Sequence, residues 1–136
     1  MAENKALRYN SGKPQWSLVE FKSLEPLVRV LEYGAHKYSL FSTESGQIIK
    51  GSEISIEESK KYTLISSGRD NWKLGLDKTE ILESLSRHLF ALMDGEKVDS
   101  ESGISHIGHI LCNALFYSHY DKELDIDELC DNEIIQ

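Results

Sequence analysis

Three charged side chains between residues 80 and 87 have the spacing of one helix face. Glu80, Glu83 and Arg87 are separated by three and four residues, so a helix would bring them together on one side. Carboxylates in this arrangement can help to hold a divalent metal that polarises a phosphate and activates water. A solvated helix face with a Glu83–Arg87 ion pair would show the same residues, so two interpretations stay open.

An acidic loop follows this face. Glu96, Asp99 and Glu101 lie within six residues, just past an expected helix end at Gly95, where their carboxylates can converge on a hard cation. Mg²⁺ prefers a few carboxylates together with water and phosphate oxygens. We therefore predict Mg²⁺ held by Glu83, Asp99 and Glu101. A loop that only keeps the protein soluble would have the same composition.

A line of polar side chains interrupts an otherwise apolar segment further along. His106, His109 and Asn113 follow at intervals of three and four residues, beside the apolar positions expected to face the core. Three polar groups in line are costly to bury without partners, and histidine can bind a metal, orient a water or donate to a phosphate. We interpret this stripe as part of a site, with Glu80, Glu83 and His106 as catalytic residues. A hydrogen-bonded core histidine is the alternative.

Basic and aromatic residues elsewhere suit a phosphorylated nucleotide. Arginine can bind a phosphate through two hydrogen bonds, and tyrosine or tryptophan can stack on a base. The segment RYNSGKP lacks the GxxxxGK[ST] pattern, so it is not a P-loop. The residues predicted to contact the ligand are Arg8, Lys13, Lys37, Tyr38, Arg69, Trp72, Arg87, His88, His109 and Asn113.

Helices are expected to position most of these groups. Apolar residues at helical spacing predict helices from Leu24 or Glu25 to Tyr38, over residues 78–93, and from about Ile104 to His119. An N-cap at Asp77 or Thr79 and the glycine at position 95 would bound the second of them.

The remaining segments are of three kinds. Residues 1–17 read as an extended arm, and residues 121–136 form an acidic tail that is either one more short helix or a frayed end. Residues 39–68 hold short β-prone runs broken by Ser, Thr and Gly, with room for one helical turn, and predict a hairpin or flap. The sequence thus predicts a single, mainly α domain over residues 1–136 with a small β-hairpin insert.

The composition limits the kinds of molecule that the protein can bind. The chain has 136 residues and a formal net charge of −8, which argues against a non-specific grip on duplex nucleic acid or an anionic membrane. Its two cysteines, Cys112 and Cys130, are too few for a disulfide framework and predict free thiols. The first residues contain no apolar run that could act as a signal peptide, so we expect a cytoplasmic protein.

Taken in order, these segments resemble a known family. LRYNSGKPQWSL, VLEYGAHKY, NW with a following Gly, and SRHLFALMDGEKVDSESGISHIGHILCNALF are similar to the small phage proteins termed dATP/dGTP diphosphohydrolase-like, distant relatives of the helical MazG-type nucleotide pyrophosphohydrolases. The resemblance covers residues 7–38 and 69–118. It implies a MazG-like helical core and Mg²⁺-dependent cleavage of a nucleoside triphosphate to monophosphate and pyrophosphate. MazG-type enzymes use a Glu-x-x-Glu helix, matched by Glu80 and Glu83, and a Glu-x-x-Asp helix, whose place is taken by His106 and His109.

The leading hypothesis is therefore a nucleoside triphosphate pyrophosphohydrolase, with a metal held by Glu83 and Asp99 and assisted by Glu80, Glu101 or His106. The alternative is a phage sponge, an anti-defence protein that sequesters a host immune signalling nucleotide without cleaving it. A purely structural protein is the third option. By analogy with MazG helices we expect a homo-oligomer, located in the host cell cytoplasm if a phage encodes it. The insert would then be a lid or a contact between subunits.

Overall fold

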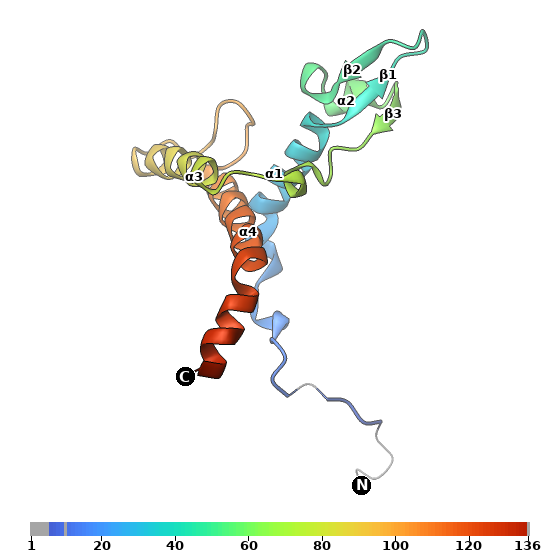
Figure 1. Cartoon of the computed structure of the whole chain (residues 1–136). Helices are drawn as coiled ribbons and strands as arrows, with labels where there is room; N and C mark the ends of the chain where they lie inside the picture. Colours follow the sequence, from blue (N-terminus) through green and yellow to red (C-terminus); the bar gives the residue numbers. More distant parts are fainter. Residues whose placement is uncertain (1–5, 10, 136) are drawn as a thin grey trace.

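Three helices form the body of the molecule: α1 (Glu25–Lys37), α3 (Lys78–Met93) and α4 (His106–Ile135). The structure is a computed structural model that describes the backbone of residues 6–9 and 11–135, and the side chains among them up to residue 121. Helix α4 packs along both α3 and α1 (Figure 1). The mainly α fold class predicted from the sequence is confirmed.

The ends of α1 and α3 follow from local sequence. Pro26 sits in the first turn of α1, where its missing N–H is not needed. The Asp77 side chain accepts a hydrogen bond of 2.8 Å from the Thr79 backbone N–H and caps α3. Gly95, with a φ of 94°, ends the helix by adopting a backbone conformation that side chains disfavour. Both helices lie within one or two residues of the predicted ranges.

Helix α4 is longer than predicted. It begins at His106, two residues after the expected start, and its backbone continues to Ile135, through the segment predicted as a separate helix or frayed tail. No glycine or proline follows Gly108 in the sequence, so nothing in the chain stops the helix at residue 119. Where α4 crosses α1, a Cβ at Gly108 would lie 2.5 Å from the carbonyl oxygen of Pro26, so only glycine allows this close approach.

The insert is a small antiparallel sheet and not a simple hairpin. Its strands are β1 (Leu40–Ser42), β2 (Ile48–Lys50) and β3 (Thr63–Ser66), in the order β2-β1-β3, with the one-turn helix α2 (Ile56–Ser59) before β3. Strands β2 and β3 overlap the β-prone runs predicted at residues 47–49 and 62–65, whereas β1 was not predicted. Phe41 in the central strand is buried, while all four residues of β3 are exposed. The sheet stands beyond the C-terminal end of α1 (Figure 1).

Buried Ser39 ties the root of this sheet to α1. Its hydroxyl donates to the Ala35 carbonyl at 2.7 Å and accepts from the Gly68 backbone N–H at 2.9 Å. Its carbonyl accepts from the Gly51 N–H at 2.8 Å. A Cβ at Gly51 would lie 1.8 Å from the His36 carbonyl oxygen, and one at Gly68 2.5 Å from that of Ala35. The insert is therefore closely packed at both ends where it meets α1.

The N-terminal arm lies apart from the body. It contains the 3₁₀ turns η2 (Trp16–Leu18) and η3 (Phe21–Leu24), the second of which leads into α1. The described arm runs away from the helices at the end opposite the sheet (Figure 1). The extended arm predicted for residues 1–17 is thus present in the described part of that range.

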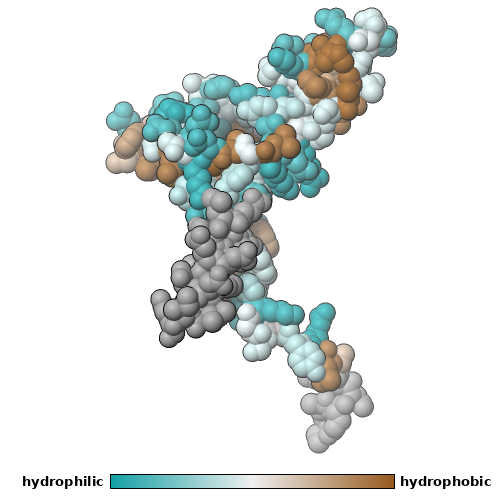
Figure 2. Space-filling model, in the orientation of Figure 1, coloured by the Kyte–Doolittle hydropathy of each residue, from teal (hydrophilic) through white to brown (hydrophobic). Residues whose placement is uncertain are grey.

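Few side chains of the described chain are deeply buried. The buried apolar residues are Val30, Phe41, Ile81 and Cys112, the last a free thiol. Cys130 lies outside the described side chains. Apolar surface instead gathers over the sheet and along α3 (Figure 2). None of the described helices combines the length and hydropathy needed to cross a membrane.

Candidate functional site

A cavity of about 710 Å³ opens between α1, α3, α4 and the loop that joins α3 to α4. This volume falls within the usual range of small-molecule sites. Its walls combine basic, acidic, imidazole and aromatic groups, which suits a charged ligand that carries a ring.

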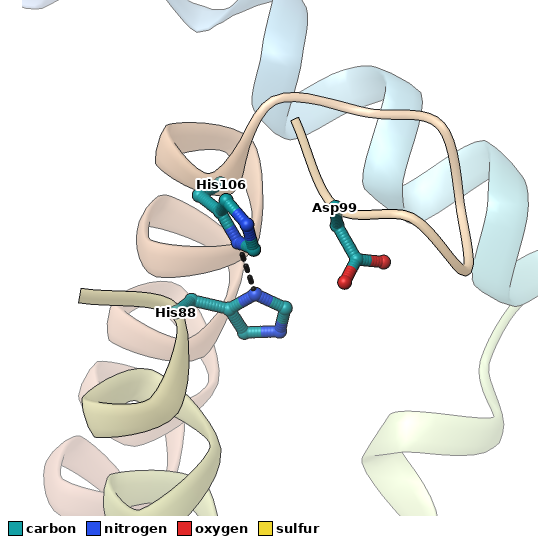
Figure 3. Close-up of side chains that lie close together, drawn as sticks. All are labelled: His88, Asp99 and His106. Carbon is teal, nitrogen blue, oxygen red and sulfur yellow. Dashed lines mark hydrogen bonds between the residues drawn. The ribbon is translucent and has the colours of Figure 1, made fainter. Parts of the chain in front are cut away.

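Two histidines and one carboxylate converge at one wall of the cavity. His88 from α3 and His106 from α4 bring their Nδ1 atoms to 2.9 Å of each other, and Asp99 from the intervening loop lies across from both rings (Figure 3). Ligand atoms of the three residues all lie within 4.8 Å of one another. His106 is 3% exposed, and its Nε2 has no hydrogen-bond partner within the described chain; the nearest acceptor, Glu96 Oε1, is 3.5 Å away.

Hydrogen bonds within the loop fix the position of Asp99. Its carboxylate accepts from the Ser102 N–H at 2.9 Å, and its backbone carbonyl accepts from the Gly103 N–H at 2.8 Å. The Ser102 hydroxyl is also 2.7 Å from His109 Nε2. His109 in turn stacks on His88, with ring centroids 4.2 Å apart and nearly parallel planes. Asp99 is therefore held in place before any ligand binds.

The environment sets the charge of these groups. Burial lowers the pKa of both His88 and His109 below 6.5, and the attraction of Asp99 only partly opposes this effect. Burial alone would raise the pKa of Asp99, but the hydrogen bonds from Ser102 and the nearby His109 outweigh it and lower that pKa below its ordinary value. At neutral pH the imidazoles of His88 and His109 are therefore uncharged and Asp99 is ionised. Histidine binds a metal in its neutral form and aspartate in its ionised form.

Aromatic residues form the opposite part of the wall. Trp72, in the turn η5 (Asn71–Leu74), stacks on Phe116 of α4 with centroids 4.8 Å apart, and meets the edge of His119 at 5.0 Å. The Tyr120 hydroxyl donates to the Trp72 carbonyl and accepts from the Gly75 N–H at 3.1 Å. This turn is thus anchored to α4, and Trp72 presents its ring from a fixed position.

One more polar group of the wall has a fixed orientation. The Asn113 Nδ2 donates to the His109 carbonyl at 2.9 Å and to the Ser84 hydroxyl at 3.2 Å. A backbone carbonyl can only accept, so the amide must face it with its nitrogen. The carbonyl oxygen of Asn113 is therefore left as an acceptor on the cavity wall.

Most of the predicted site residues meet in this cavity. Four do not line it: Arg8 and Lys13 lie in the arm, and Glu80 and Glu83 lie exposed on α3. Lys37 pairs with Glu101 across the cavity mouth at 3.7 Å. The predicted residues that line it are Lys37, Tyr38, Arg69, Trp72, Arg87, His88, Asp99, Glu101, His106, His109 and Asn113.

Sequence reasoning missed Ser102, which binds Asp99 and His109 at once. In Asp99-x-x-Ser102 the carboxylate accepts from a backbone N–H three residues on, as the side chain of an N-cap aspartate does. That spacing was the available signal.

The fold and the site define a helical protein with a nucleotide-sized cavity beside a cluster of three potential metal ligands. The chain belongs to the family described as "dATP/dGTP diphosphohydrolase, N-terminal", whose sequence model matches residues 3–128. The family suspected from the sequence is thereby confirmed. No curated protein and no solved structure matches the chain.

Proposed function

We propose that the protein cleaves a purine deoxynucleoside triphosphate to its monophosphate and pyrophosphate, with a divalent metal bound by His88, Asp99 and His106. The family description names a diphosphohydrolase of dATP and dGTP, which supports the substrate class. The observation that carries the proposal is the convergence of these three side chains at the wall of a nucleotide-sized cavity.

The donor set fits a first-row transition metal. Two nitrogens that share such an ion at about 2.1 Å lie roughly 3.0 to 3.4 Å apart, and the two Nδ1 atoms are 2.9 Å apart. With both Nδ1 lone pairs used in this way, each ring carries its proton on Nε2. His106 Nε2–H would then face Glu96 Oε1, now 3.5 Å away, as a carboxylate that orients a metal-bound histidine.

The other cavity residues would hold the substrate. Lys37, Arg69 and Arg87 can offset part of the negative charge of the triphosphate, and an arginine can bind a phosphate through two parallel hydrogen bonds. Trp72, whose ring already stacks on Phe116, offers an apolar contact for the base at the cavity wall. The Asn113 carbonyl oxygen offers an acceptor for an exocyclic amine or ring N–H of a purine. A metal bound beside these groups would polarise the attacked phosphate and lower the pKa of a bound water.

Two kinds of divalent metal ion are candidates. The sequence predicts Mg²⁺, which favours oxygen ligands, whereas two imidazoles favour ions such as Mn²⁺, Co²⁺ or Zn²⁺. Glu83, one of the predicted Mg²⁺ ligands, does not line the cavity. We therefore propose that a transition metal supports the higher activity and that Mg²⁺ is the weaker cofactor.

The experiment is a substrate and metal panel. Purified protein is freed of metal, supplied with Mg²⁺, Mn²⁺, Zn²⁺ or chelator, and incubated with the four deoxynucleoside triphosphates while both products are quantified. We expect monophosphate and pyrophosphate in equal amounts from dATP or dGTP, and no turnover in chelator. His106→Ala should lower kcat/KM by about 100-fold or more and abolish the rise in melting temperature that metal gives. Glu44→Gln, in the exposed hairpin turn, is the matched control.

Two results would contradict this proposal. Full turnover in chelator would exclude the metal, and full activity of His106→Ala would exclude the cluster. Retention of an intact nucleotide without products, released on denaturation, would favour the alternative, in which the protein sequesters a nucleotide.

A further inference from the structure

The N-terminal arm exposes large apolar side chains that the body of the chain does not cover. Leu7 is 81% exposed, Trp16 74% and Phe21 73%. Burial of such a side chain is worth about 1.5–3 kcal/mol, so an arm of this composition is stabilised when it lies against a protein surface. In the structure it instead runs away from its own helices (Figure 1).

The charge of the arm is opposite to that of the chain. Arg8 and Lys13 are its ionisable side chains between residues 6 and 18 apart from Tyr9, and the first carboxylate after them is Glu20. The whole chain has a net charge of −8. A basic, aromatic arm is therefore complementary to an acidic protein surface.

The cavity has too little positive charge for a triphosphate. Its three basic side chains, Lys37, Arg69 and Arg87, are matched by three carboxylates of the loop that joins α3 to α4, and Lys37 is already paired with Glu101. The cavity is also partly open to solvent. Additional cations from another segment would complete it.

Exposed apolar surface on α3 also favours contact with another protein chain. Along α3 an unpartnered apolar stripe repeats at helical spacing, with Leu82, Leu89, Phe90 and Met93 all exposed.

We propose that two or more copies of this chain assemble so that the N-terminal arm of one copy completes the nucleotide cavity of another. Arg8 and Lys13 would then add two cations to the phosphate side of that cavity, and Tyr9 and Trp16 would cover its open side. The proposal rests on the nucleotide site proposed above. It explains why the family match includes the arm although the arm does not line its own cavity.

The first measurement is the mass in solution without ligand. Light scattering at micromolar concentration should give a multiple of 15.5 kDa, at least twofold. A monomer would overturn the proposal. Trp16→Ala combined with Phe21→Ala should shift the assembly toward monomer, with its helical circular dichroism kept.

The second measurement tests whether the arm reaches the cavity of its own copy or that of a neighbouring copy. Arg8→Ala/Lys13→Ala removes the arm cations, and His106→Ala disables the cluster; each is expected to lose most activity. When the two variants are unfolded and refolded together in equal amounts, the mixture should regain about a quarter of wild-type activity. Half of the cavities then have an intact cluster, and half of those receive an intact arm from a neighbouring copy. No gain on mixing, or full activity of the arm variant alone, would overturn the proposal. Lys61→Ala, an exposed lysine of the insert, is the matched control for charge loss.

A binding readout separates this proposal from the proposed catalysis. If the wild type turns over no nucleotide, the affinity for a non-hydrolysable dATP analogue replaces activity, and Arg87→Ala replaces His106→Ala as the cavity variant. High-affinity sites that reappear on mixing support arm exchange even without catalysis. High affinity in the wild type that mixing does not restore overturns it.

Discussion

At the residue scale, Asp99 is the group that brings negative charge to the histidine cluster. Its lowered pKa keeps it ionised at neutral pH, and the Ser102 N–H holds it in place. An uncharged isostere in this position keeps the shape of the loop and removes the charge, so it separates a metal role from a packing role.

We predict that Asp99→Asn lowers metal affinity and kcat/KM by about 100-fold or more while the melting temperature of the metal-free protein stays within a few degrees. The asparagine carbonyl can still accept from the Ser102 N–H, so the loop should hold. Calorimetry with Mn²⁺ and steady-state kinetics provide the measurements. Glu83→Gln is the discriminating comparison: it should keep activity if the cluster binds the metal. If it loses activity as fully as Asp99→Asn, the ligand set predicted from the sequence is the better one.

The histidines also make stability depend on pH. Because burial lowers the pKa of His88 and His109 below 6.5, the unfolded chain takes up protons at a pH where the folded protein does not. The free energy of unfolding of the metal-free protein should therefore fall as the pH drops from about 7 toward 5. Urea unfolding across that range measures the slope, and His88→Gln/His109→Gln should flatten it. A slope equal to that of the wild type would show that these two rings do not titrate differently on folding.

The sequence predicted which residues line the cavity better than it predicted how they lie relative to one another. Spacing along one helix placed His106, His109 and Asn113 on one side because helical periodicity fixes it. No periodicity relates His88 to Asp99 or His106, since the path of the loop between α3 and α4 depends on the hydrogen bonds around Asp99 and Ser102. For that reason the sequence predicted Glu83 as the metal ligand from α3, whereas the structure brings His88 of the same helix next to Asp99 and His106.

At the element scale, close backbone contacts decide how the sheet is joined to α1. Gly51 and Gly68 touch the carbonyls that end this helix, where no side chain fits. Gly34, within the same helix, has no atom within 4 Å of an added Cβ. These three glycines therefore differ in their tolerance of the same methyl group.

We predict that Gly51→Ala and Gly68→Ala each lower the free energy of unfolding by about 2 kcal/mol or more, because the new methyl group forces backbone apart. Gly34→Ala should raise it by up to ~1 kcal/mol, since alanine favours a helix interior. Urea denaturation followed by circular dichroism measures all three. Equal effects at the three positions would show that the root of the insert is not closely packed.

A helix or strand could be predicted where nearby residues mark its ends or its periodicity. The cap at Asp77 and the glycine at position 95 set α3 to its predicted range. Strand β1 was missed because its three residues, Leu40–Ser42, include no β-branched residue, whereas Ile48 and Ile49 mark the equally short β2. It forms because β2 and β3 pair with it on both sides, which is a tertiary effect.

At the scale of the whole molecule, the sheet is a second surface that suits another copy. Strand β3 is an edge strand with unpaired backbone groups along its outer side. Ile48, Ile56, Leu64 and Ile65 on the insert are each at least half exposed. None of residues 40–67 lines the cavity in this structure. These features favour a contact between subunits over a lid, although both were expected from the sequence.

Replacement of residues 42–66 by a short Gly/Ser linker tests both roles at once. We predict a folded protein, because α4 packs on both α1 and α3 without the sheet. Nucleotide affinity should fall at least about tenfold, or ~1.4 kcal/mol. If the sheet joins subunits, the assembly becomes smaller by light scattering, and affinity falls because the neighbour's arm no longer reaches the cavity. If the sheet closes over the ligand, affinity falls while the mass per assembly stays that of the wild type with the shortened chain. An unchanged assembly with unchanged affinity would contradict both roles and leave the insert without a part in the site.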